Sequence, residues 1–137
     1  MGLVYEHITL KNAADVCNVR RGIIKNPDIR QLKVCAMVDT GAEMLVINES
    51  IRQQLGLDIL DEQEICLAND SAEMCKITEP VEVHWKERYT FVPALVLEGA
   101  NEVLLGAIPL EGMNLIVDPG GRQLIGANGD KVIYKVK

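Results

Sequence analysis

The chain has 137 residues, and its apolar and polar positions alternate with a period of two over most of that length. This period is typical of β-strands whose two faces meet different surroundings. We predict strands at 3–10, 32–38, 45–47, 64–70, 71–78, 81–85, 89–98, 102–105 and 115–117, followed by a closing hairpin over 122–137. Eight or more strands with little helix predict an all-β fold, a closed β-barrel or a closed sandwich.

Helical signals are few. Residues 49–55 form the clearest helix, because Asn48 is a good N-cap and Gly56 is a typical C-terminal stop. A second short helix is expected near Pro109. The segment 12–30 is irregular, and Pro93 predicts an edge or a bulge in its strand. We therefore expect a single domain over 1–137 with one or two short helices.

Composition narrows the possible partners. The formal net charge is −6, no run of five basic residues occurs, and aromatic residues make up only 4%. These features predict that the protein binds neither nucleic acid nor an anionic membrane. No signal peptide or membrane-length apolar run is recognisable, so we expect a cytoplasmic protein. Four cysteines and two histidines occur without zinc-ligand spacing, so we expect no metal.

The stretch CAMVDTGAEMLVI at 35–47 places Asp39, Thr40 and Gly41 between apolar residues. An ionised carboxylate is costly to bury, so Asp39 must be paired, neutralised or used in chemistry. The alternative is a plain strand-to-turn loop in which Asp39 caps its own backbone. The tripeptide by itself does not decide between these interpretations.

Its context resembles the active-site loop of aspartic proteases, in particular the small bacterial members of the retropepsin-like group. Apolar residues precede Asp39-Thr40-Gly41, Ala42 follows it, and Leu104-Leu105-Gly106 stands before a short predicted helix. The closing DPGGRQLIG at 118–126 is also similar to small bacterial members. The resemblance runs from residue 32 to the end of the chain, and the segment 12–30 departs from it.

The resemblance implies an aspartic endopeptidase that needs no cofactor and acts on peptide or protein substrates. Asp39, Thr40 and Gly41 would be catalytic, and Leu104-Leu105-Gly106 would pack behind their loop. A single Asp-Thr-Gly provides half a site, so the enzyme would be a homodimer with two Asp39 carboxyls sharing one proton. The hairpin over 64–77 would be the flap that closes over substrate. The implied substrate-binding residues are Ala42, Glu43, Leu67, Ala68, Asn69 and Asp70.

Two departures from the family pattern keep alternatives open. The hairpin tip has no glycine, and Ala107 stands where an arginine would pair with Glu43. The hairpin would otherwise be a plain surface element. The same fold could serve as a peptide-binding dimer without significant catalysis, or as a structural barrel with an incidental Asp-Thr-Gly.

Overall fold

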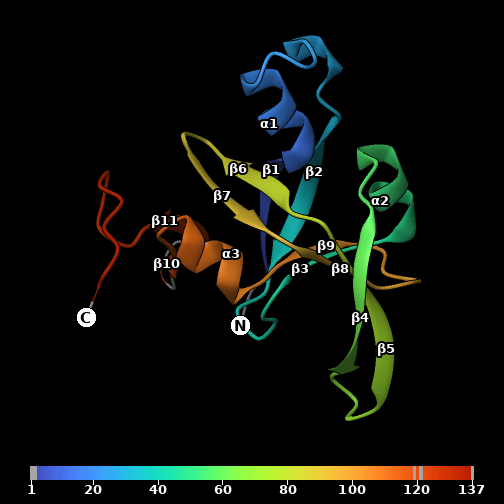
Figure 1. Ribbon diagram of the computed structural model, residues 1–137. Helices are drawn as coiled ribbons and strands as arrows, with labels where there is room; N and C mark the ends of the chain where they lie inside the picture. The colour runs from blue at the N-terminus through green and yellow to red at the C-terminus, as the bar shows by residue number, and fades with distance from the viewer. Residues whose placement is uncertain (1–2, 119, 121, 137) are drawn as a thin grey trace.

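The computed structural model describes residues 3–118, 120 and 122–136, and these form a mostly β structure (Figure 1). The strands are β1 (Val4–Asn12), β2 (Gln31–Val38), β3 (Leu45–Ile47), β4 (Ile59–Cys66), β5 (Ala72–Thr78), β6 (Val81–Trp85), β7 (Arg88–Val92), β8 (Ala94–Val96), β9 (Val103–Leu105), β10 (Leu115–Asp118) and β11 (Gln123–Gly126). The α-helices are α1 (Ala13–Arg20), α2 (Glu49–Leu55) and α3 (Ala107–Gly112), and η1 (Asn26–Asp28) is a 3-10 turn. The predicted all-β class is confirmed in its coarser form, as a mostly β fold with a few short helices.

The expectation of one or two short helices was too low, because α1 forms in the segment judged irregular. Its N-cap is Asn12, whose Oδ1 accepts a hydrogen bond of 3.1 Å from the Asp15 backbone N–H. Ala13 and Asp15 are its buried residues, so α1 lacks the apolar stripe by which a helix is recognised in sequence. The predicted helix α2 is confirmed, with Asn48 as its cap and Gly56 in the left-handed region at φ 65°. No helix in the described ranges is long and apolar enough to cross a membrane.

Nine strands join in one sheet in the order β4-β5-β8-β3-β9-β2-β1-β6-β7. The outer strands are β4 and β7, so the pairings of the described residues do not close the sheet into the expected barrel. The central strand β9 runs parallel to β2 on one side and antiparallel to β3 on the other. This arrangement brings the residues around 38, 45 and 105 together, although they are far apart in sequence.

The predicted strand at 89–98 is divided at Pro93 into β7 and β8. Proline has no N–H with which to continue a ladder. The chain changes partners there: β7 pairs with β6, whereas β8 pairs with β3 and β5. The 94–96 stretch thereby enters the middle of the sheet, where all three of its residues are buried.

The predicted closing hairpin over 122–137 is wrong. β11 pairs with β10, and Asn128 forms only an isolated bridge with Lys131. Residues 132–136 belong to no strand, and the Asn114 side chain holds this tail by donating 2.9 Å to the Ile133 carbonyl. The preceding turn at 118–121 lies partly outside the described residues. The apolar alternation of the tail predicted a strand paired with 122–127. Instead, β11 pairs with β10, and the tail forms no strand among the described residues.

The main core lies between the sheet and helices α2 and α3, and its largest fully buried side chains include Leu10, Leu45, Leu55 and Leu105. A second, smaller cluster of buried side chains comes from β3, β5 and β8 and consists of Val46, Cys75, Ile77 and Leu95. At about 1.5–3 kcal/mol for each buried aliphatic side chain, these clusters supply the main stabilisation. The second cluster fastens the base of the β4–β5 hairpin to the sheet.

The ion pair of Asp15 with Arg30 makes stability depend on pH. The Arg30 guanidinium donates from Nε and Nη2 to the Asp15 carboxylate, each over 2.9 Å. These hydrogen bonds hold the pKa of Asp15 below its ordinary value, against the opposing effect of burial. The pair therefore stabilises the fold fully above the unfolded pKa of about 3.9, and that stabilisation is lost as pH falls through the lower folded pKa.

We expect Asp15→Asn to remove this part of the pH dependence. The measurement is urea unfolding at one protein concentration between about pH 2 and pH 6, for wild type and variant. Asp130→Asn is the control for loss of a carboxylate that is exposed and makes no side-chain hydrogen bond or ion pair among the described residues. Parallel curves for wild type and Asp15→Asn would contradict the assignment.

Candidate active site

The loop that follows β2 holds Asp39 in a defined orientation. The Asp39 N–H donates 3.0 Å to the Leu105 carbonyl, and the Ala42 N–H donates 3.1 Å to the Asp39 carbonyl. The Gly41 N–H donates 3.0 Å to Asp39 Oδ1. Asp39 is half-buried, whereas Thr40 and Gly41 are exposed in the single chain. The loop thus presents one carboxylate at the surface with its backbone fixed.

The second carboxylate oxygen of Asp39 accepts no hydrogen bond from any part of the chain that the structure describes. The apolar residues before it belong to the sheet: Ala36 is fully buried, and Met37 and Val38 are half-buried. Their apolar character is therefore explained by the core, and the carboxylate emerges where the strand ends. One oxygen is oriented and the other is available to a ligand.

A close backbone crossing supports the loop from behind. β9 lies parallel to β2 with Met37 opposite Leu104 and Val38 opposite Leu105. A Cβ on Gly106 would collide with the Met44 carbonyl oxygen and would lie 2.8 Å from the Ala42 carbonyl oxygen. Only glycine fits such a crossing without moving backbone. The packing of 104–106 behind the loop, which the sequence predicted, is confirmed.

Helix α3 completes this support. Its first N–H groups have no partner within the helix, because the first turn has no preceding carbonyls to bind. The Ala107 N–H donates 2.8 Å to the Ala42 carbonyl, and the Ile108 N–H donates 2.8 Å to the Glu43 carbonyl. The carbonyls of the loop and the first N–H groups of the helix therefore bind each other. In this way α3 helps to hold the loop that carries Asp39.

Of the predicted substrate-binding residues, Ala42 and Glu43 belong to the Asp39 loop. The Glu43 side chain is exposed and makes no hydrogen bond or ion pair with the described residues. Ala107 follows the crossing glycine and contributes its backbone N–H to the loop, not a cation to Glu43. The carboxylate of Glu43 is accordingly free to meet a ligand.

The other four predicted residues form the tip of the β4–β5 hairpin. The Leu67 N–H donates 2.8 Å to the Ser71 carbonyl, and the Asp70 N–H donates 2.9 Å to the Leu67 carbonyl. Asn69 Oδ1 accepts 2.6 Å from the Ser71 hydroxyl. Asp70 adopts φ 64°, the left-handed conformation that glycine supplies in many turns. An ordered tip without glycine is therefore possible here.

The two groups lie in separate loops of one chain. No hydrogen bond or ion pair among the described residues joins the 39–43 loop to the 67–70 turn. Figure 1 shows both the loop after β2 and the hairpin tip on the side of the molecule away from α1. Four half-buried apolar residues pack against the second cluster: Met44, Ile65, Leu97 and Leu104. We call them the apolar floor. Sequence reasoning missed this apolar floor, because its residues have the same period-two pattern as any core strand.

The sequence pattern of the gag-polyprotein putative aspartyl protease family matches residues 27–116. The chain belongs to this family. The match includes the residues of the Asp39 loop, the β4–β5 hairpin and the Gly106 crossing. It begins after α1, which is consistent with the departure noted for the segment 12–30.

Two solved structures are similar to this chain. The retroviral protease-like domain of Ddi1 from Leishmania major is 16% identical, with a TM-score of 0.58 over 93% of this chain and 90% of that chain. A retropepsin-like aspartic protease from Rickettsia conorii is 17% identical, with a TM-score of 0.47 over 85% of each chain. No curated protein matches the chain. The Ddi1 domain supports a retropepsin-like fold for this member of the gag-polyprotein putative aspartyl protease family.

Gly106→Ala should disrupt the loop support of this family member. The added methyl group meets backbone oxygens on two residues, which cannot move aside as a flexible side chain would. We expect a loss of about 2–3 kcal/mol in the free energy of unfolding, measured by urea denaturation. Gly120→Ala is the matched control, because its nearest contact would be an ordinary 3.6 Å. Equal stabilities of the two variants would contradict the crossing.

Proposed function

We propose that this protein is an aspartic endopeptidase whose dyad consists of Asp39 from each of two identical chains. The observation that carries the proposal is the Asp39 loop, which presents an oriented carboxylate with one free oxygen on a scaffold fixed by Gly106. Membership of an aspartyl protease family supports the same chemistry. Residues 1–137 would act as one domain that holds half a site.

The chemistry needs two carboxyl groups that share one proton. Like charges about 3 Å apart cannot both ionise easily, so one group stays protonated. The ionised Asp39 accepts a proton from water while the water oxygen bonds to the peptide carbonyl carbon, and the protonated Asp39 donates to the carbonyl oxygen. Collapse of the tetrahedral intermediate breaks the C–N bond: the departing amine takes the proton that the first Asp39 accepted from water, and a hydroxyl of the intermediate returns a proton to the second Asp39, which restores the dyad.

The single chain is suited to such pairing. Thr40 and Gly41 are exposed beside Asp39, so a second copy can approach the loop without removing other elements. In the proposed homodimer, the Thr40 hydroxyl reaches the partner's loop and locks the two loops together. The Gly41 N–H, already bound to Asp39 Oδ1, holds the carboxyl in the plane that the shared proton requires.

Substrate would lie extended between the loop and the β4–β5 hairpin. Ala42 and Glu43 would bind its backbone from below, and Leu67, Ala68, Asn69 and Asp70 would close over it. The half-buried apolar floor beneath the hairpin would accept apolar side chains of a peptide or protein substrate. The tip turn is ordered by its own hydrogen bonds, so the hairpin would move as a unit rather than unfold at its end.

A second candidate function is peptide binding by the same dimer without significant turnover. The exposed Glu43 favours this function. Glu43 has no cation partner among the described residues, so the loop lacks the acid–arginine pair that the protease pattern implies. Both functions would use the same peptide-binding surface, between the Asp39 loop and the β4–β5 hairpin, and the same homodimer. They differ in whether a bound peptide is hydrolysed.

Asp39→Asn should abolish hydrolysis while peptide binding persists. An amide cannot accept the proton of the attacking water, so we expect turnover to fall by about 10³-fold or more. The assay is mass-spectrometric detection of cleavage in a diverse peptide mixture. Cleavage by wild type and not by Asp39→Asn supports the protease. Binding without cleavage by either protein supports the second candidate.

A subunit-mixing experiment tests the shared dyad. Wild type and Asp39→Asn are mixed in equal amounts and left to exchange subunits. About one quarter of the dimers then carry two aspartates, so activity should fall to about one quarter of that of pure wild type at the same total concentration. Independent active monomers would retain about half. That outcome would refute the half-site.

A further inference from the structure

The β4–β5 hairpin is fastened to the sheet mainly at its base. β4 is an edge strand that pairs only with β5, and β5 meets β8 only at Lys76 and Ile77 within the described residues. Figure 1 shows the hairpin projecting from the body beyond this point. Residues 55–58, which lead from the end of helix α2 into β4, therefore connect the hairpin to the body. We call them the hinge segment.

Side chains from outside the hairpin bind the backbone along the hinge segment. Arg52 Nη1 donates 2.7 Å to the Leu57 carbonyl. Glu79, which directly follows β5, accepts 3.1 Å from the Asp58 N–H, and its own N–H donates 2.9 Å to the Asp58 carbonyl. The two strands of the hairpin are thus tied together at their root, and Leu57 is fully buried.

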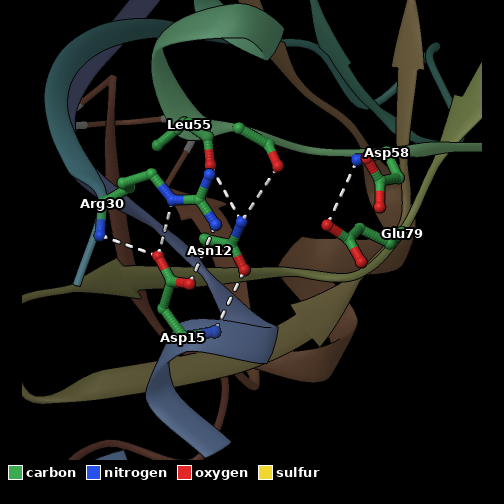
Figure 2. A network of polar contacts seen from close by, with 7 residues as sticks. Asn12, Asp15, Arg30, Leu55, Asp58 and Glu79 are labelled. Atoms are coloured by element: carbon green, nitrogen blue, oxygen red, sulfur yellow. Dashed lines mark hydrogen bonds and ion pairs between the residues drawn. The ribbon is translucent and has the colours of Figure 1, made fainter. Parts of the chain in front are cut away.

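Asn12 binds the same hinge from the other side. Its side chain is fully buried, and Nδ2 donates 2.9 Å to the Leu55 carbonyl and 3.3 Å to the Gly56 carbonyl. Its Oδ1 caps helix α1 at Asp15. One amide therefore connects the first turn of α1 to the end of α2, as Figure 2 shows.

Arg30 also contacts both helix α1 and the hinge segment. Its guanidinium is paired with Asp15 and lies against Gly56, where any Cβ would collide with it. Its backbone carbonyl accepts 2.9 Å from the Asn12 N–H, which pins the two ends of the segment together. Asp58 and Glu79 lie close enough to raise the pKa of Arg30 further, although Asp15 is the main cause. The positive charge thus sits beside the acidic root of the hairpin.

We propose that the segment 12–30 is a brace that holds the hinge segment and so sets how readily the β4–β5 hairpin opens and closes. Asn12 and Arg30 are positioning residues, because they act on the hairpin through residues 55–58 and touch neither Asp39 nor the tip. Helix α1 precedes the family match at 27–116, whereas Arg30 lies inside it. The consequence for substrate rests on the proposed function.

Two variants loosen the brace without destroying its parts. Asn12→Ser keeps a good helix N-cap, but serine is too short to reach the carbonyls of 55 and 56. The double variant Asp15→Asn/Arg30→Met removes the ion pair without leaving a buried charge unpaired. The controls are Asn18→Ser and Arg21→Met, which repeat the Asn→Ser and Arg→Met changes in the segment 12–30 at side chains without a hydrogen bond to the hinge among the described residues.

The first measurement is hydrogen exchange by mass spectrometry on the full-length protein. We expect exchange over 59–78 to rise by roughly ten-fold in both brace variants, while β1, β2 and β6 keep wild-type protection. Exchange over 59–78 equal to that of the controls would overturn the proposal. A uniform rise through β1, β2 and β6 would also overturn it, because it would show a general loss of stability.

The second measurement separates the brace from the proposed function. With a cleaved peptide, we expect KM to rise roughly five-fold with little change in kcat, because the loosened hairpin orders less readily over substrate. Reduced kcat with unchanged KM would indicate a smaller active fraction and would overturn the link to substrate. Absence of Asp39-dependent cleavage in wild type would refute the protease, and the exchange data would still decide the brace.

Discussion

The close passage of Gly106 behind the Asp39 loop is the constraint on which the rest of the site depends. At this point the chain after β9 lies against the carbonyls of Ala42 and Met44, with no room for a side chain. Helix α3 begins directly after this passage, and its first N–H groups donate hydrogen bonds to carbonyls of the loop. Two backbone segments about sixty residues apart thereby satisfy each other, and the carboxylate is held without any side-chain support.

The two elements of the candidate site are attached in different ways. The Asp39 loop is held by backbone hydrogen bonds to β9, the central strand of the sheet, and to helix α3. The β4–β5 hairpin is at the sheet edge and is fastened by an apolar cluster and by the polar contacts at residues 55–58. A hydrolytic dyad needs invariant geometry, whereas a substrate groove must open. The different attachments of the two elements fit these different needs.

The segment 12–30 makes its contacts with the end of helix α2 through a buried side chain, Asn12. It contributes little to the apolar core, since Ala13 and Asp15 are the buried residues of α1. Its contacts are polar and directional, and they converge on the end of α2. Because each of these contacts joins groups distant in sequence, the segment appears as an irregular stretch until the chain is folded.

Local chemistry was enough to predict several features from the sequence. The period-two pattern identified most of the strands, and Asn48 and Gly56 delimited α2, whereas the crossing of Gly106 behind Asp39 was implied by the family resemblance. These features depend on neighbouring residues or on a residue type that only one conformation requires. The residues that carried the resemblance, Asp39-Thr40-Gly41 and Leu104-Leu105-Gly106, lie within the matched range 27–116.

Other features were decided only by the tertiary structure. Helix α1 lacks an apolar stripe, and its N-cap residue, Asn12, also donates a hydrogen bond to the distant Leu55 carbonyl. The tail at 132–136 alternates like a strand, yet β11 pairs with β10 and the tail binds Asn114. The fold decides which groups come within hydrogen-bond distance of one another. It therefore decides which strand a segment pairs with and which groups a buried amide binds. Local sequence specifies how a segment tends to fold, and long-range packing specifies what it meets.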